Sequence, residues 1–306
     1  MVVARCTGAA GLLVIVAAAA LLALDVWPVT IFVTPIVWTG YILAVDAAVF
    51  SMRGESLLRT HRPALAWMAV LSVGLWLIFE AYNLRLQNWD YRGLPESRVL
   101  RTAGYVWSFA TIWPAILETA ALLLATKFGK RSARSVAAPR GCDRGALRGG
   151  DGGTLRHGDE AALREEGGAP SRLLVAAGAL ALILPAVLPR LWSSYLFGLV
   201  WMGFVLLLDP LNDRAGRPSI SRDLREGRHG RPLALLVAGV ICGFLWKFWN
   251  YWATAKWVYV FPIGQGAKIF EMPLPGYLGF PVFAVEVFVM YVYAAGTLRI
   301  PCYEIR

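Results

Sequence analysis

The sequence predicts an all-α, polytopic membrane protein with eight transmembrane helices in two tandem four-helix repeats. Hydrophobic residues make up 58% of the 306 residues and charged residues 16%, whereas a soluble domain is about half apolar and about a quarter charged. The apolar residues are gathered in long blocks, which is typical of membrane spans. Landmark residues in the first half of the chain recur in the same order in the second half, which indicates an internal repeat.

Eight apolar segments qualify as candidate spans, because a helix needs about 20 mainly apolar residues to cross the hydrocarbon core. Arg5 before the first apolar run would also fit a signal peptide. We favour a retained helix, because the fifth segment holds the same place in the second repeat. The eight segments are Ala9–Leu24, Val29–Phe50, Ala64–Tyr82, Gly104–Thr126, Leu173–Pro189, Leu191–Leu208, Leu233–Tyr251 and Tyr277–Gly296.

The distribution of positive charge predicts that both termini are cytoplasmic. An even number of spans places the two termini on the same side of the membrane. With that side inside the cell, the inner segments hold 22 of the 30 Lys and Arg residues, which is the bias that orients membrane proteins. We therefore expect a multi-pass protein of the bacterial inner membrane, in contact with the lipid bilayer.

The chain divides into three parts: residues 1–126 form the first repeat, 127–172 a linker and 173–306 the second repeat. The linker is basic, rich in Gly and Arg, and poor in large apolar residues. Such a segment cannot bury enough surface to offset the entropy of folding. We expect a disordered cytoplasmic linker.

Composition and motifs exclude several function classes. The net charge of +10 lies in loops beside apolar spans, so it fits membrane topology better than nucleic-acid binding. The four cysteines form no CxxC pair and the three histidines lie in loops, so we expect no metal site, no cofactor and no disulfide framework. Walker A, GxSxG and HExxH motifs are absent, which disfavours ATP-driven transport.

The repeat is carried by short matching segments. Residues 38–46 read WTGYILAVD, and residues 201–209 read WMGFVLLLD. Each is followed by a basic loop ending in Arg-Pro, a helix ending in Asn, a Trp-x-Tyr segment, a Gly-Tyr pair and a helix with a Pro before a Glu. Because each unit has an even number of spans, an axis along the membrane normal should relate the two units. This predicts a bundle with pseudo-two-fold symmetry.

Glu118 and Glu286 are the candidate catalytic residues. Each lies inside a predicted span, near mid-depth at about 1.5 Å of rise per residue. An ionisable group there is costly unless it is paired or wetted, which points to a functional site. A carboxyl kept protonated by burial is a proton donor. In the structural alternative, which has about equal weight, each Glu only bonds a neighbour and fixes helix packing.

Asp46 and Asp209 are ionisable residues at the cytoplasmic end of the second span of each repeat. Water is close at this depth, and Arg53 or Arg214 could pair with the two carboxylates. We therefore expect a structural, anchoring role for both aspartates rather than a chemical one.

Asn83, Asn250, Glu80 and Lys247 gather at the outer end of the third span of each repeat. An Asn side chain both donates and accepts hydrogen bonds, so it can orient a carboxyl or a substrate, although Asn also caps helix ends. Glu80 and Lys247 precede their asparagines by three residues and carry opposite charges. The two could pair across the seam between the repeats.

Trp89, Tyr91, Trp257 and Tyr259 are repeated aromatic residues in the two long outer loops. An interfacial belt explains most aromatic residues of a membrane protein. The alternative is a substrate-lining role in a cavity whose π faces stabilise a carbocation. Both loops contain Pro and Gly, and we expect them to fold back over the bundle.

An ordered set of residues occurs twice in the chain: a helix-terminal Asn, then Trp-x-Tyr, Pro, Gly and a Pro before a Glu. This order resembles the lycopene cyclase domain family of heterodimeric or fused carotenoid cyclases. The resemblance covers Ala64–Thr126 and Leu233–Gly296. It implies small tandem helical units and acidic residues that handle protons. This chain has Asn83 and Asn250 where the family has a helix-terminal Asp, and a single Glu where the family has two.

Three functions are consistent with these features. The first is an intramembrane enzyme that cyclises or isomerises an isoprenoid lipid, with Glu118 or Glu286 as the acid and Asn83 or Asn250 orienting it. The second is a transporter or lipid-handling protein with its site between the repeats. The third is a membrane scaffold subunit. A long apolar tunnel favours the first, a polar cavity the second and the absence of a cavity the third.

Overall fold

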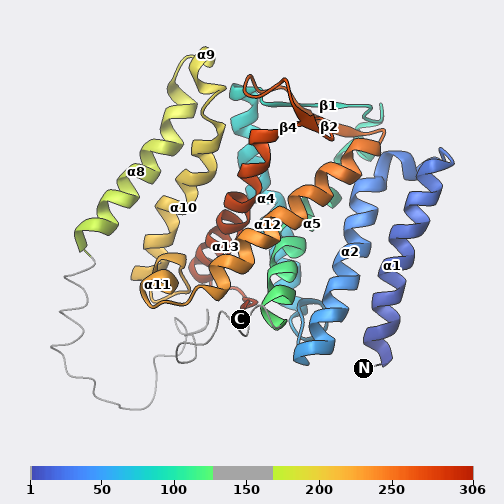
Figure 1. Cartoon of the computed structure of the whole chain (residues 1–306), viewed down its shortest axis with the longest axis horizontal. Coiled ribbons are helices and arrows are strands. Elements are labelled where there is room, and N and C mark those ends of the chain that lie inside the picture. The colour runs from blue at the N-terminus through green and yellow to red at the C-terminus, as the bar shows by residue number, and fades with distance from the viewer. Residues whose placement is uncertain (1, 127–167, 306) are drawn as a thin grey trace.

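The computed structural model describes residues 2–126 and 168–305, and it is mainly helical (Figure 1). The long helices are α1 (Val2–Ala23), α2 (Val29–Arg53), α4 (Arg62–Leu86), α5 (Arg98–Ala125), α8 (Gly168–Val187), α10 (Phe197–Arg214), α12 (Gly230–Trp252) and α13 (Gly279–Leu298). The short elements are α3 (Leu57–Thr60), β1 (Trp89–Arg92), α9 (Arg190–Ser193), α11 (Ile220–Arg225), β2 (Lys256–Tyr259), β3 (Lys268–Ile269), β4 (Met272–Pro273) and the 3₁₀ turn η2 (Leu274–Leu278).

Among the described residues, six helices are long and apolar enough to cross a membrane: α1, α2, α4, α5, α12 and the continuous segment of η2 and α13. This agrees with the predicted all-α membrane fold. The helices at the places of the fifth and sixth predicted spans differ from the other six, because the apolar part of α8, Ser171–Val187, is shorter and α10 carries three charged residues. α8 begins at Gly168, inside the predicted linker, and residues 127–167 of that linker lie outside the described residues.

The helices α4, α5, α12 and α13 form the centre of the bundle, and two helix pairs flank it (Figure 1). α1 packs along α2 on one side, and α8 packs along α10 on the other. The start of α1 and the C-terminal segment lie at one end of the bundle, which we call the inner end. The strands β1 and β2 lie at the opposite, outer end.

Each flanking pair is joined by a close contact between two glycines. A Cβ atom at Gly11 would overlap Gly40 O, and a Cβ atom at Gly178 would lie 2.8 Å from Gly203 O. Small residues let helix backbones approach closely in a membrane, where van der Waals packing drives association. The second glycine of each pair follows the repeated Trp by two residues, so the matching sequence segments build the same joint twice.

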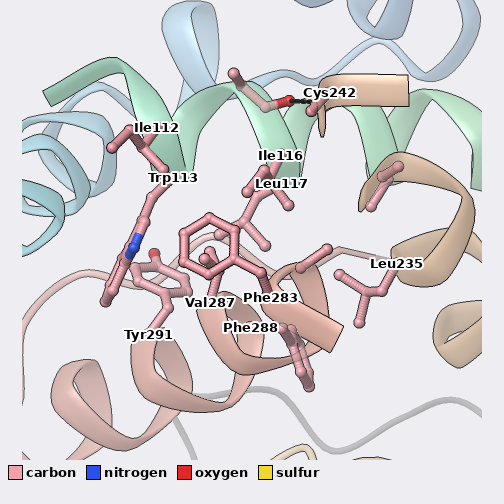
Figure 2. Packing of buried hydrophobic residues seen from close by; sticks show 14 of the residues in the cluster. Ile112, Trp113, Ile116, Leu117, Leu235, Cys242, Phe283, Val287, Phe288 and Tyr291 are labelled. Atoms are coloured by element: carbon pink, nitrogen blue, oxygen red, sulfur yellow. Dashed lines mark hydrogen bonds between the residues drawn. The ribbon is translucent and has the colours of Figure 1, made fainter. Parts of the chain in front are cut away.

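Side chains of α5 and α13 fill the centre of the bundle (Figure 2). Ile116 and Leu117 of α5 face Phe283 and Val287 of α13, and all four are at most 4% exposed. α12 adds Cys242, which contacts a threonine hydroxyl of α5 at 3.5 Å. In a membrane such a core is stabilised by close packing rather than by transfer out of water.

The strands β1 and β2 pair as an antiparallel ribbon, with Trp89 opposite Tyr259 and Tyr91 opposite Trp257. β1 belongs to the first half of the chain and β2 to the second, so backbone hydrogen bonds join the halves at the outer end. The two outer loops were predicted to fold over the bundle, but their strand pairing was not predicted. A strand of four residues is too short for its alternation to be distinguished from a loop.

The C-terminal segment, residues 299–305, folds against the inner end of the bundle. Tyr303 N donates to Tyr291 Oη at 2.7 Å, and the rings of Tyr303 and His61 meet edge to face at 5.2 Å between centroids. Cys302 in this segment is disulfide-bonded, which corrects the expectation that the cysteines form no disulfide.

Candidate functional site

An aromatic cavity lies beneath the β1–β2 ribbon at the outer end of the bundle. Its volume is about 110 Å³, and its walls come from both halves of the chain. Trp89, Tyr91, Trp257 and Tyr259 all line it, together with ten further aromatic side chains. The ribbon register places the Trp of each half opposite the Tyr of the other. The structure thus brings the four repeated aromatics together in one wall.

Few charged groups reach this cavity. Arg101 and Lys256 line it, but each already has partners. Arg101 donates to Pro95 O at 3.0 Å, and Lys256 Nζ lies 3.6 Å from Glu271 Oε1. An apolar cavity of about 150 Å³ in another protein binds benzene, so a cavity of about 110 Å³ fits a few carbon atoms of an apolar ligand.

Two asparagines hold the ribbon in place. Asn83 Nδ2 donates to Trp89 O at 2.9 Å, and Asn83 Oδ1 accepts from Trp89 N at 3.2 Å. Asn250 makes the same two bonds to Trp257, at 2.8 and 3.1 Å. An amide can satisfy a backbone donor and acceptor together because it carries both functions. In the part of the chain that the structure describes, neither amide bonds a carboxylate, and both hold the backbone of the ribbon.

Glu80 binds the edges of three aromatic rings in the first half. Its Oε1 accepts a hydrogen bond from Tyr91 Oη at 2.6 Å. The indole N–H groups of Trp76 and Trp89 donate to the same oxygen at 3.0 and 3.3 Å. Ring edges are the positive side of the aromatic quadrupole, and hydrogen bonds to an ionised carboxylate are stronger than neutral ones. Glu80 therefore fixes the orientation of these three rings.

Lys247 occupies the equivalent place in the second half and meets ring faces. Its Nζ lies 5.6 Å from the centroid of Trp257 and 5.0 Å from that of Tyr259, where the negative π face attracts a cation. The side chain is fully buried, and Nζ has no hydrogen-bond partner in the described part of the chain. No ion pair joins Glu80 and Lys247, contrary to the expectation.

Burial changes the acidity of two tyrosines in the ribbon. It raises the pKa of Tyr259 from 10.0 to about 12. Burial, followed by the negative charge of Glu80, raises the pKa of Tyr91 well above its usual value. Both side chains are therefore neutral phenols at neutral pH, and Tyr91 Oη keeps the proton that it donates to Glu80.

Asp46 anchors the short helix α3 at the inner end. Its Oδ1 accepts from Leu58 N at 2.8 Å, which satisfies one of the N–H groups left unpaired at a helix start. Arg59, and not Arg53 as predicted, lies beside this carboxylate, with Nε 3.4 Å from Asp46 Oδ2. Arg53 pairs with Glu55 at 3.0 Å. Through these contacts Asp46 of α2 holds the start of α3.

Asp209 does the same for α11 in the second half. Its two oxygens accept from Ile220 N at 2.7 Å and Ser221 N at 2.9 Å. Arg214, the predicted partner, donates to Ser171 instead. Two backbone donors satisfy the buried carboxylate, so Asp209 also has the contacts of an anchor.

Glu118 lies in the half of α5 that is nearer the inner end of the bundle. It is fully buried, and its Oε1 accepts from Leu57 N of α3 at 2.8 Å. The cavity-lining residues of α5 end at Ile112, which is about 9 Å from Glu118 along the helix axis at 1.5 Å per residue. Glu118 therefore joins Asp46 in holding α3 and does not line the cavity.

Glu286 lies one helical turn inward of the cavity. Phe283, three residues earlier on the same face of α13, lines the cavity. Helical side chains lean toward the N-terminus of their helix, which for α13 is the outer end. Glu286 is fully buried, and neither of its carboxyl oxygens has a hydrogen-bond partner among residues 2–126 and 168–305. Of the two predicted acids, Glu286 is the one that approaches the cavity.

The two predicted acids are not equivalent in the packing of the two halves. Phe109 O of α5 accepts from Ser72 of α4, and Phe280 O of α13 lies against Gly239 of α12. Ser72 and Gly239 both precede the ribbon-holding Asn by eleven residues. If Phe109 O and Phe280 O are taken as equivalent positions, Glu118 and Glu286 lie about one helical turn apart. Each half therefore has one buried carboxyl that the other half lacks.

Trp38, Trp201 and Trp76 also line the cavity, and sequence reasoning did not assign them to a site. Trp38 and Trp201 stand in the matching segments, so the repeat contained the signal for them. Trp76 precedes Asn83 by seven residues, or two helical turns, and therefore shares its face. Its counterpart in the second half is Gly243, so the repeat gives no sign of it.

In the described ranges, no group of three or more His, Cys, Asp or Glu side chains could hold a metal ion. The site instead offers ring faces, the phenols of Tyr91, Tyr105 and Tyr259 and, one helical turn inward, the Glu286 carboxyl, which has no hydrogen-bond partner in those ranges. No protein-family model matches the chain, and neither a curated protein nor a solved structure matches it.

Proposed function

We propose that the protein is an intramembrane enzyme that cyclises or isomerises an isoprenoid lipid, with Glu286 as the initiating acid. The observation that carries the proposal is a fully buried carboxyl without a hydrogen-bond partner in the described residues, one turn inward of an aromatic cavity. An ionisable group at this depth in a membrane protein points to a functional site. The apolar lining favours a hydrocarbon ligand over a polar transport substrate.

The cavity would take one end of the isoprenoid chain. Its volume suits a few carbon atoms, as noted above, whereas a long isoprenoid is much larger. Ile31 and Phe32 of α2 and Leu100 of α5 contribute to the lining, and Leu100 is 37% exposed. The remainder of the chain would therefore leave the cavity between α2 and α5 toward the bilayer.

The reaction would need no redox partner. The protonated Glu286 would add its proton to one carbon of an alkene, which leaves a carbocation on the neighbouring carbon. The π faces of the cavity would stabilise this cation, and attack by a second alkene of the same chain would close a ring. Loss of a proton from the product cation to the Glu286 carboxylate would restore the acid, so substrate and product have the same composition.

In this proposal α8 and α10 also span the membrane, which gives eight spans and places both termini in the cytoplasm of a bacterial cell. The glycine contact shared by the α1–α2 and α8–α10 pairs supports the count. The charge bias of the loops supports the orientation.

The resemblance to the lycopene cyclase domain family supports a carotenoid as the substrate. The family's helix-terminal acid is replaced by Asn83 and Asn250, which hold the ribbon. The acid in this chain would therefore be Glu286 alone.

The test is pigment chromatography of a lycopene-accumulating bacterial host that expresses the protein. We expect cyclised carotenoid with the wild type and none with Glu286→Gln, which removes the proton and keeps the side-chain size. The exposed outer-loop variant Glu96→Gln is the matched control and should retain the product. Product lost in Glu118→Gln but kept in Glu286→Gln would show that the acid is assigned wrongly. Unchanged lycopene, with the protein present in the membrane, would exclude carotene cyclisation.

A further inference from the structure

Two side chains on the wall of the aromatic cavity bury a polar atom that has no hydrogen-bond partner in the described residues. They are Thr34, through its Oγ1, and Trp38, through its Nε1. Both lie on α2, about one helical turn apart, and they are 6% and 1% exposed. A buried donor or acceptor that stays unpaired is costly in a folded protein. A polar atom of a bound molecule would remove this cost, so the two groups indicate a ligand.

The Thr34 hydroxyl lacks its usual partner because that partner is engaged elsewhere. A Thr inside a helix commonly bonds the carbonyl four residues earlier. Thr39 of the same helix does so, with its Oγ1 donating to Pro35 O at 2.8 Å. For Thr34 the corresponding carbonyl is Thr30 O, which accepts from Thr254 N at 3.0 Å. The loop after α12 thus occupies the acceptor, and the Thr34 hydroxyl remains available to a ligand.

The indole of Trp38 is surrounded by rings that do not satisfy its N–H group. The ring centroids of Tyr41, Trp246 and Trp249 lie 5.2, 5.0 and 4.9 Å from that of Trp38, and a ring face is a weak acceptor. Trp38 is also the innermost cavity-lining residue of α2. It lies about 9 Å inward of Phe32 along the helix axis, at 1.5 Å of rise per residue. The N–H group without an acceptor therefore lies deep in the cavity.

We propose that the cavity binds an isoprenoid that carries one neutral oxygen, a hydroxyl or a carbonyl, at its bound end. Trp38 Nε1 donates to this oxygen, and the Thr34 hydroxyl donates to it or accepts from it. An ionic head group is disfavoured, because both groups are neutral and do not offset the cost of removing a charge from water. The inference rests on the cavity of the proposed function and narrows its ligand to an oxygenated isoprenoid.

The test is equilibrium binding of two tritiated probes to the purified full-length protein in detergent, with binding to empty micelles subtracted. The probes are farnesol, which has a hydroxyl, and farnesene, which has none. Trp38→Phe keeps an aromatic ring and removes the N–H group, and Thr34→Val keeps the side-chain shape and removes the hydroxyl. Each variant should weaken farnesol binding about three- to tenfold, which corresponds to one hydrogen bond, and change farnesene binding by less than about twofold.

The matched control is Trp107→Phe, which removes an indole N–H group that bonds Thr39 at 3.0 Å. Trp107 does not line the cavity, so both probes should bind this variant as they bind the wild type. Equal weakening of both probes by the two cavity variants, unchanged farnesol binding in them, or no saturable binding of farnesol to the wild type would overturn the proposal. Because binding is measured without turnover, farnesol binding together with unchanged lycopene would reject the carotene reaction and keep the oxygenated ligand.

The stability of the ligand-free protein separates a ligand group from a structural one. Thr34→Val removes a buried hydroxyl without a partner in the described residues, so it should keep or raise the thermal unfolding midpoint. Thr39→Val is the comparison, because it loses the bonds to Pro35 O and Trp107 Nε1 and should lower the midpoint by a few °C. An equal decrease in Thr34→Val would show that its hydroxyl is bonded within the fold, which would also overturn the proposal.

Discussion

The two halves of the molecule share their anchoring contacts and differ in their ionisable groups. Each half has a glycine joint between its first two helices, an Asp that holds a short inner helix and an Asn that holds a ribbon strand. At the outer end the first half has Glu80 against ring edges, and the second has Lys247 against ring faces. Equivalent aromatic residues in the two halves therefore bind charges of opposite sign. Ring edges bind the carboxylate of Glu80, and ring faces bind the ammonium group of Lys247.

The two halves thus share a set of backbone contacts and differ in the ionisable side chains that they add to it. The shared contacts satisfy backbone groups, and a half that lost them would leave buried donors unpaired. The buried carboxyls at Glu118 and Glu286 satisfy no such shared need. In the second half, Val289 occupies the position that is equivalent to Glu118. In the first half, Ala115 occupies the position that is equivalent to Glu286. The chemistry can thus differ between the halves while the framework stays the same.

The largest effect expected is from the glycine joints. Gly40→Val and Gly178→Val would each press a side chain against backbone atoms of the neighbouring helix, and such overpacking costs about 1–3 kcal/mol. We expect both variants to lower the unfolding midpoint in detergent by similar amounts. Gly74→Val is the control, because a Cβ atom there meets no atom within 4 Å. A lowered unfolding midpoint in only one of the two variants would show that the two glycine joints do not pack in the same way.

The second prediction concerns the two charges at the outer end. Lys247→Met removes a buried cation without a hydrogen-bond partner in the described residues. Because the attraction between Lys247 and the ring faces is smaller than the cost of burying the charge, the variant should stabilise the fold by about 1 kcal/mol. Glu80→Gln keeps an acceptor but loses the charge-assisted bonds, and should destabilise by about 1–2 kcal/mol. Chemical unfolding followed by Trp fluorescence measures both. Shifts of the same sign would contradict the distinction between ring edges and ring faces.

The smallest effect at neutral pH is expected from Tyr259. Its folded pKa of about 12 lies above the unfolded value of 10.0, so the folded state binds this proton more tightly. The resulting stabilisation is fully present below pH 10 and is lost as the pH rises from about 10 toward about 12. Tyr259→Phe should therefore show a shallower loss of stability in that window. Tyrosinate absorbance of the native protein gives an independent reading, and titration of all tyrosines near pH 10 would contradict the prediction.

Much of the framework could be predicted because apolar blocks and turn residues determine it locally. The helices Val29–Arg53 and Gly230–Trp252 begin and end within a few residues of the predicted spans. The repeat also predicted which aromatics gather at the outer end. The β1–β2 ribbon was not predicted, because its pairing joins residues about 170 positions apart and depends on how the halves meet.

The site was predicted less well because depth and register depend on tertiary packing. The Pro before each Glu suggested that Glu118 and Glu286 are equivalent, yet the contacts of α5 with α4 and of α13 with α12 shift one helix by about a turn. The contact of Glu118 with α3 arises from a short inner loop that carries no sequence signal for it. Lys247 lies over two ring faces and does not pair with Glu80, and charge alone could not indicate this.

The β1–β2 ribbon also restricts the motions open to the bundle. Alternating access in transporters built from two repeats requires one repeat to rock against the other. Here a ladder of backbone hydrogen bonds crosses from one half to the other at the outer end. A rocking motion that widened this end would have to break the hydrogen bonds between β1 and β2 and those of Asn83 and Asn250 to the two strands. The ribbon would therefore keep the two halves together at the outer end, and a ligand would enter from the bilayer, between two helices.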